Sequence, residues 1–257
     1  MTSGIPAVAT GAADGPALEP RPVAAPELQA VLLDMDGTLV DTEGIWWEAE
    51  AAVFRELGFV LDEVHRAVVV GGPMTRSASY LIEVTGADIT LADLTVRLND
   101  RFTELIDGSV PMLPGARRLL TELAAHRVPT ALVSASHRKV IDRVLRTIGA
   151  EHFRLTVAGD EMERTKPHPD PYLAAAAGLG ADPARCVVIE DTPTGVAAGE
   201  AAGCPVVAVP SVAPIEPAAG RTVVPSLEEV DVPFLRRLIS GKEPATRRSC
   251  RAIVPNE

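Results

Sequence analysis

Short apolar runs recur along the chain, and stretches with helical periodicity separate most of them. The predicted strands are Gln29–Leu33, Thr130–Val133, Leu155–Ala158, Val187–Ile189 and Val206–Val209, with Thr222–Val224 as a further candidate. The predicted helices between them are Gly115–His126, Lys139–Ile148, Asp170–Ala177 and Gly195–Ala202. This alternation is typical of a parallel sheet with helices on both faces.

One connection departs from the alternation. Between Thr42 and Met112 no strand is predicted, and the sequence is helical nearly throughout. The predicted helices are Glu43–Leu57, Leu61–Val69, Arg76–Thr85 and Leu91–Ile106, the last with Thr90 as its N-cap. We therefore expect an α/β fold, a Rossmann-like doubly wound parallel sheet with a helical cap domain inserted after the first strand.

The chain ends lack such periodicity. Residues 1–27 are rich in Ala, Pro and Gly and predict a disordered tail, while residues 241–257 predict a loose, basic, flexible tail. The core domain is expected at residues 28–41 and 112–240, and the helical cap at 42–111. An insertion at this end of a sheet can exclude water from a site and select its substrate.

Composition and charge narrow the class of protein. Hydrophobic residues make up 47% and charged residues 23% of the 257 residues, an ordinary balance for a globular protein in water. The formal net charge of −11 disfavours binding to nucleic acid or to an anionic membrane. The three cysteines form no C-x-x-C pair, so neither a zinc site nor a disulfide framework is predicted.

The length of the apolar runs and the first residues of the chain indicate where in the cell to expect the protein. No run is long enough to span a membrane, and the first residues lack the pattern of a signal peptide. We expect a cytoplasmic protein; a monomer is compatible with the sequence, which leaves the oligomeric state open.

The most informative polar positions follow the first strand. Asp34 and Asp36 lie two residues apart, directly before Gly37. Alternate residues of an extended chain share a face, and open parallel sheets bind ligands at the carboxyl ends of their strands. Crowded carboxylates repel unless a cation separates them or one holds a proton. The pair predicts a metal site or a nucleophile beside an acid/base, with a structural Asp-rich turn as the alternative.

Three later strand ends add polar groups. Ser134 follows the second strand, Lys166 lies in a proline-rich loop, and Glu190-Asp191 ends the fourth strand. Each has a structural alternative: Ser134 as a helix N-cap, Lys166 as an exposed loop residue. Because four strands of one sheet end in order in such groups, we expect a single site.

The same positions offer ligands for a hard cation. Mg²⁺ takes oxygen ligands from carboxylates, carbonyls and water. The side chains of Asp34 and Asp191, with the main-chain carbonyl of Asp36, would supply them.

With these residues in order, the sequence resembles the haloacid-dehalogenase superfamily of hydrolases, in the subgroup with a helical cap after the first motif. The motifs match as Asp34-Met35-Asp36-Gly37-Thr38, Ser134, Lys166 and Glu190-Asp191, and the resemblance spans roughly residues 30–209. Within the superfamily, the chain is most similar to sugar-phosphate phosphatases and β-phosphoglucomutases.

The resemblance implies a Mg²⁺-dependent phosphatase that forms an aspartyl phosphate. Asp34 would attack phosphorus. Asp36 would protonate the leaving alkoxide and then deprotonate the hydrolytic water.

The resemblance also implies a phosphate-binding set. Mg²⁺, Ser134 and Lys166 would neutralise the phosphoryl oxygens, and backbone amides near Met35 and Ala135 would donate to them. Glu190 would be the supporting acid of the last motif.

Two other chemistries of the superfamily are disfavoured. Dehalogenation does not use an acid/base two residues after the nucleophile, and Asp36 stands there. Phosphonate cleavage resembles imine chemistry through a cap lysine, and the chain has no lysine between Thr42 and Met112.

Two alternatives remain beside the phosphatase. A phosphosugar mutase of the β-phosphoglucomutase type would carry a histidine where this chain reads Ile45-Trp46-Trp47. A non-catalytic phosphate-binding regulatory module would be expected to lack Asp34 or Asp36.

Cap residues would choose the substrate, a small phosphorylated metabolite such as a sugar or polyol phosphate. Glu43 and Trp46 or Trp47 are expected at the junction of core and cap. Arg76 follows a Gly/Pro loop and would meet a second anionic or hydroxyl-rich end of the substrate; a solvated helix arginine is the alternative.

Overall fold

The computed structural model describes residues 27–69, 74–106, 110–211 and 213–241. Both predicted tails lie almost wholly outside these residues, as does the Gly71-Gly72-Pro73 loop before Arg76. The two tails therefore stay predictions.

In the described part of the chain, six parallel strands form one sheet in the order β3-β2-β1-β4-β5-β6. They are β1 (Ala30–Leu33), β2 (Thr130–Val133), β3 (Leu155–Val157), β4 (Cys186–Glu190), β5 (Val206–Ala208) and β6 (Arg221–Val223). Because β1 pairs with β2 on one side and β4 on the other, the chain winds outward in both directions from β1. The predicted doubly wound fold is confirmed, and its switch point lies at the carboxyl end of β1.

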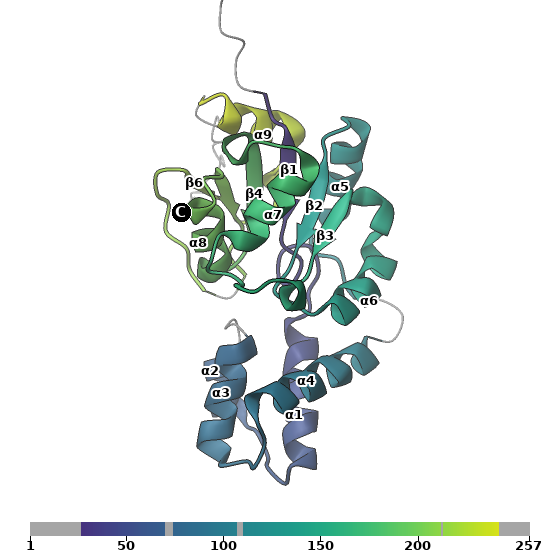
Figure 1. Ribbon diagram of the computed structural model, residues 1–257, viewed down its shortest axis with the longest axis vertical. Coiled ribbons are helices and arrows are strands. Elements are labelled where there is room, and N and C mark those ends of the chain that lie inside the picture. Colours follow the sequence, from purple (N-terminus) through teal and green to yellow (C-terminus); the bar gives the residue numbers. More distant parts are fainter. Residues whose placement is uncertain (1–26, 70–73, 107–109, 212, 242–257) are drawn as a thin grey trace, which may run out of the picture.

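Helices cover both faces of the sheet (Figure 1). They are α5 (Ala116–Ala125), α6 (Arg138–Ile148), α7 (Asp170–Leu179), α8 (Pro193–Ala201) and α9 (Val232–Ile239). Short 3₁₀ turns add η1 (Ala150–His152), η2 (Gly159–Glu161), η3 (Pro183–Arg185) and η4 (Leu227–Glu229).

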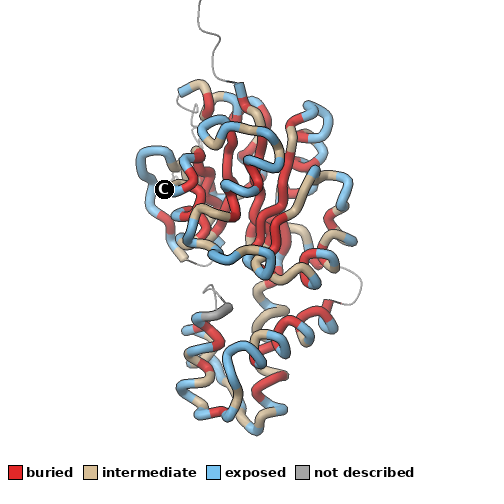
Figure 2. Tube along the Cα trace, viewed as in Figure 1, coloured by how far each residue is buried: buried red, intermediate tan, exposed pale blue. Residues whose placement is uncertain are grey.

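The alternation of side chains along β1 explains the two layers. Val31 and Leu33 pack with α5, α6 and α9, whereas Ala30 and Leu32 pack with α7 and α8. Both faces of a parallel sheet are covered in this way, so its strands read as continuous apolar runs. Figure 2 shows the central strands buried along their length.

Four helices between β1 and α5 form a separate unit at the carboxyl end of the sheet, the helical cap (Figure 1). They are α1 (Glu43–Glu56), α2 (Glu63–Val69), α3 (Met74–Thr85) and α4 (Leu91–Leu105). The cap has its own core, with Phe54, Leu81 and Leu98 fully buried. Thr90 accepts a hydrogen bond from the amide of Asp93, which confirms it as the N-cap of α4.

The cap also packs against the sheet domain. Phe102 of α4 belongs to the core cluster of the sheet domain and stacks on Trp46 of α1, with ring centroids 3.9 Å apart. Lys139 of α6 donates to Asp100 of α4 at 2.6 Å. Among the described residues, no helix is long and apolar enough to cross a membrane.

Element boundaries differ from the prediction by a few residues, and one helix was missed. Helix α9 follows Asp231, whose side chain accepts from the amide of Phe234 and so caps it. Its buried residues Val232, Leu235 and Ile239 have helical spacing. Eight residues give too short a periodic signal to stand out beside a charged tail.

Candidate active site

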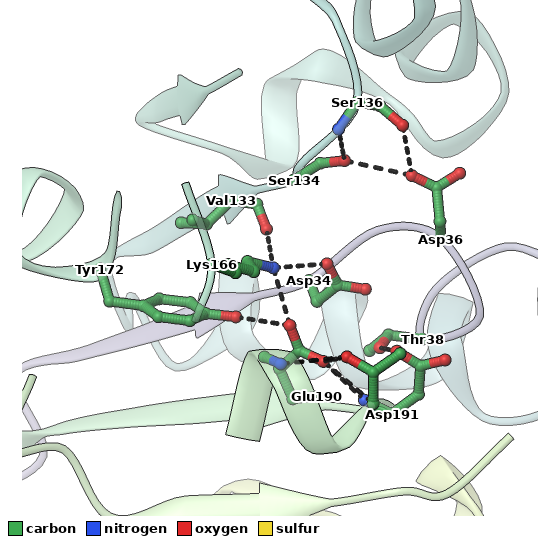
Figure 3. Close-up of polar contacts among 12 residues, drawn as sticks. Asp34, Asp36, Thr38, Val133, Ser134, Ser136, Lys166, Tyr172, Glu190 and Asp191 are labelled. Carbon is green, nitrogen blue, oxygen red and sulfur yellow. Dashed lines mark hydrogen bonds and ion pairs between the residues drawn. The ribbon is translucent and has the colours of Figure 1, made fainter. Parts of the chain in front are cut away.

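The carboxyl ends of the central strands and the cap enclose one cavity of about 430 Å³. Its lining residues include Asp34, Asp36, Ser134, Ala135, Lys166, Glu190 and Asp191 from the sheet domain, and Glu43, Trp46, Trp47 and Glu50 from the cap. The structure therefore brings every predicted site residue of the sheet domain to one place (Figure 3).

Lys166 lies at the centre of the polar contacts (Figure 3). Its Nζ donates to Asp34 Oδ1 at 2.7 Å, to Glu190 Oε1 at 2.7 Å and to the carbonyl of Val133 at 2.8 Å. These contacts use all three donors of the ammonium group, and its side chain is only 5% exposed. Burial alone would lower the pKa of Lys166, but the two carboxylates raise it well above its ordinary value. Lys166 is therefore a fixed cation and not an exposed loop residue.

Glu190 holds this lysine in place. Its Oε1 accepts from Lys166 and from the Tyr172 hydroxyl at 3.0 Å, and its Oε2 accepts from the amides of Asp191 and Thr192. Although burial would raise the pKa of Glu190, Lys166 lowers it below its usual value. Both oxygens have partners, so Glu190 acts on Lys166 and on the turn after β4.

Asp34 differs from Glu190, because one of its carboxylate oxygens has no described partner. Its Oδ1 accepts from Lys166, whereas the buried Oδ2 has no hydrogen-bond partner among the described residues. Burial, then the charge of Glu190, raises the pKa of Asp34 to about 7 in spite of Lys166. A buried carboxylate oxygen without a partner is costly and indicates a place for a ligand.

Asp191 brings a further negative charge to the same point. Its oxygens accept from Thr38 Oγ1 at 3.3 Å and from Ser211 Oγ at 2.5 Å. Burial, then the charges of Asp34 and Glu190, raise the pKa of Asp191 well above its usual value.

These carboxylates fit a hard cation. Asp34, Glu190 and Asp191 each offer an oxygen, and the three oxygens lie within 4.8 Å of one another. Since Glu190 is already occupied, the free Oδ2 of Asp34 and the carboxylate of Asp191 are the groups open to a metal. Carboxylate oxygens with excess negative charge suit Mg²⁺.

Asp36 has different partners from Asp34. Its Oδ1 accepts from Thr42 Oγ1 at 2.8 Å, and its Oδ2 accepts from Ser134 Oγ at 3.1 Å and Ser136 Oγ at 2.8 Å. The two aspartates predicted as a pair therefore lie in separate hydrogen-bond networks of one cavity (Figure 3).

The predicted phosphate-binding groups are present but not all are free. Ser134 donates its single proton to Asp36, so its contact with a phosphate stays a prediction. The amides of Met35 and Ala135 donate to no other group in the described ranges, and Ala135 lines the cavity. The amide of Ala135 therefore remains available to an anion in the cavity, whereas Met35 is fully buried and does not line it.

The cap contributes part of the predicted set. Glu43, Trp46 and Trp47 line the cavity, and burial, then the charge of Asp41, raises the pKa of Glu43. Arg76 lies exposed on α3 and is not among the residues that line this cavity, so the structure does not bring it to the site.

The Ser136 hydroxyl, which like Ser134 follows the second strand, contacts Asp36 as its place at the sheet edge suggests. Sequence reasoning missed Tyr172, Ser211 and Glu50. The hydroxyl groups of Tyr172 and Ser211 contact site carboxylates, but no local pattern marks a serine or tyrosine for such a contact. Glu50 had a signal: it follows Trp46 by four residues, so both lie on one face of α1.

Comparison with known proteins agrees with this site. The model of the haloacid dehalogenase-like hydrolases matches residues 31–209. A bifunctional riboflavin kinase/FMN phosphatase of Arabidopsis thaliana is 37% identical over 186 residues, which are 70% of this chain and 48% of that protein. The chain thus spans about half the length of that relative.

Two further relatives match over most of their length. Hexitol phosphatase A of Escherichia coli K12 is 33% identical over 215 residues, 83% of this chain and 94% of that protein. The solved structure of a CbbY variant from Rhodobacter sphaeroides, in complex with xylulose-(1,5)bisphosphate, has a TM-score of 0.69 at 26% identity. That match covers 79% of this chain and 96% of the CbbY chain. The four motifs, the fold and these matches agree: the chain belongs to the haloacid dehalogenase-like hydrolase family.

Proposed function

We propose that the protein is a Mg²⁺-dependent phosphatase that hydrolyses a sugar or polyol phosphate through an aspartyl-phosphate intermediate. Its broad class, a phosphoric monoester hydrolase, follows from the family and from relatives named as phosphatases. The observation that carries the proposal is the pair Asp34 and Asp36, which line one cavity with different partners. This difference supports one carboxylate as the nucleophile and the other as the group that transfers protons.

The residues divide the reaction between them. Asp34 forms a bond to phosphorus while the bond to the leaving alkoxide breaks, and Asp36 gives that alkoxide a proton. Asp36 then takes a proton from water as the water oxygen bonds to phosphorus and Asp34 is released. Lys166 keeps a fixed positive charge beside Asp34 throughout, and the amide of Ala135 donates to the phosphoryl oxygens.

The metal site is part of the same proposal. The side chains of Asp34 and Asp191, with the main-chain carbonyl of Asp36, would hold Mg²⁺. The ion would supply positive charge against the phosphoryl oxygens. Lys166 supplies positive charge as well but has no N–H left for the phosphoryl oxygens, because its three donors already serve the protein.

The substrate class rests on the cavity and on the relatives. A volume of about 430 Å³ suits a small metabolite. Hexitol phosphatase and the CbbY complex point to phosphorylated sugars and polyols. The mutase is disfavoured, because Trp46 lines the cavity in the stretch where mutases carry a histidine. A cytoplasmic location and a monomeric state stay predictions from sequence.

A phosphate-release assay over a panel of sugar and polyol phosphates tests the proposal. Asp34→Asn should lower turnover by at least ~10³-fold while circular dichroism stays unchanged. Chelation should stop the wild-type reaction, and added Mg²⁺ should restore it. Phosphate release by Asp34→Asn at the wild-type rate would contradict the assignment of Asp34 as the nucleophile. Activity that persists in chelator would contradict the proposed metal. Isomerisation of β-glucose 1-phosphate without phosphate release would favour the mutase.

A further inference from the structure

Glu50 is a buried carboxylate of the cap that no step of the proposed reaction uses. It lies on α1, lines the cavity and is only 6% exposed. Within the described ranges it has no hydrogen bond or ion pair. Burial raises the pKa of Glu50 to about 7, so a large fraction is ionised at neutral pH. A buried, unpaired carboxylate that faces a cavity is a hydrogen-bond acceptor without a donor.

The charges on the cap side of the cavity all have one sign. Glu43 and Glu50 line it there, and no described lysine or arginine of the cap does. Among the described residues that line it, the cap side therefore offers acceptors and no cation.

Two arginines of the cap, Arg66 and Arg76, do not line the cavity. Arg66 lies over the ring of Trp47, with 5.8 Å between Cζ and the ring centroid, and pairs with Glu63 at 3.7 Å. Arg76 is exposed. The charge of Arg66 lowers the pKa of Glu43 and so reaches that carboxylate. No arginine acts in this way on Glu50, whose pKa is raised by burial.

This arrangement discriminates between substrates by charge. A second phosphate placed against Glu50 would meet a buried carboxylate that no described cation of the cap contacts, and like charges repel strongly in a partly desolvated site. A hydroxyl group would instead donate to Glu50 and satisfy it, in a charge-assisted hydrogen bond.

We propose that Glu50 is a specificity-determining residue that accepts a hydrogen bond from a hydroxyl group at the far end of a monophosphate and excludes substrates with a second phosphate there. The inference rests on the proposed phosphatase function and names its substrate class: polyhydroxylated monophosphates. It separates this chain from the related CbbY, whose solved complex holds a bisphosphate.

The test compares kcat/KM for a hexitol monophosphate with that for a ketopentose 1,5-bisphosphate, at saturating Mg²⁺. Wild-type protein should prefer the monophosphate by at least ~10²-fold, and Glu50→Gln should reduce that ratio by at least ~10-fold, mainly through KM. Glu50→Asp keeps the charge but shortens the side chain. It should therefore still reject the bisphosphate while its KM for the monophosphate rises. Glu48→Gln, an exposed position of the same helix, is the matched control and should behave as wild type.

A simple aryl phosphate, p-nitrophenyl phosphate, separates the two possible failures in wild-type protein. No phosphate release from any ester would overturn the proposed function and the inference with it. Release from the aryl ester, with a ratio that Glu50→Gln leaves unchanged, would overturn the inference alone.

Discussion

At the residue scale, the charges around Lys166 should control stability as well as catalysis. Lys166→Met would leave Asp34 and Glu190 buried without their cation, so the free energy of unfolding should fall by about 3–5 kcal/mol. Lys139→Met breaks a pair with Asp100 whose side chains are 61% and 52% exposed, and should cost at most ~1 kcal/mol. Urea unfolding in chelator measures both. Equal losses of unfolding free energy in the two variants would show that burial adds nothing to the stability that the Lys166 ion pairs provide.

Glu50 should give the stability a defined pH dependence. Its pKa rises from 4.5 in the unfolded chain to about 7 in the folded protein, because burial disfavours the charged form. Between these values the folded state keeps a proton that the unfolded state loses, so this group lowers the free energy of unfolding as pH rises. Above pH 7 the loss is complete and amounts to roughly 3 kcal/mol.

The substitution Glu50→Gln replaces this titrating carboxyl group with an amide that does not titrate. The variant should gain stability relative to wild type between pH 5 and pH 8, by roughly 2.5 kcal/mol, since part of the loss in wild type has occurred by pH 5. Urea unfolding at both pH values measures the difference, and other titrating groups cancel because both proteins share them. A difference in the free energy of unfolding between variant and wild type that is the same at both pH values would contradict the raised pKa of Glu50.

At the element scale, the loop that leaves β1 depends on a glycine. Gly37 has φ of +77°, and a Cβ there would lie 2.1 Å from Asp191 Oδ2. Gly58, after α1, has φ of +91° but open space around it. Both alanine variants should lose about 1 kcal/mol of stability, or more for Gly37. Only Gly37→Ala should also lose activity, by at least ~10²-fold, because it displaces Asp191, a proposed ligand of the metal. Similar activity in both variants would exclude this role.

The elements also show what the sequence could and could not predict. The strands and cap helices were predictable because their apolar periodicity is strong, and the site followed since parallel strands end at one edge. The strand order was not predictable, as nothing local sets which strands pair. Tyr172 and Ser211 contact Glu190 and Asp191 only through tertiary packing, which no short motif records. Arg76 was expected at the cleft from its place at a helix start, but its side chain faces solvent.

At the scale of the whole molecule, the proposed catalytic groups and the proposed substrate-selecting groups come from different parts of the chain. The sheet domain supplies the groups around Asp34, and the cap supplies Glu43 and Glu50 on the opposite part of the lining. The two units meet through Trp46 and Phe102 as well as through the cavity. On the proposed function, a change in the cap should therefore alter the substrate without altering the groups that act on phosphorus.

Net charge gives the whole molecule one more measurable property. The chain carries −11, and the described cavity lining holds seven carboxylates against one lysine. A phosphorylated substrate is therefore repelled as it approaches, and added salt screens that repulsion. At saturating Mg²⁺, kcat/KM should rise several-fold between about 0.05 M and 0.3 M ionic strength, while kcat stays constant, since the bound complex no longer depends on the approach. Initial rates in NaCl and in tetramethylammonium chloride would separate screening from a specific effect of sodium. A fall in kcat/KM with salt would instead show that the positive charge inside the site, from Lys166 and the metal, dominates the field that the substrate meets.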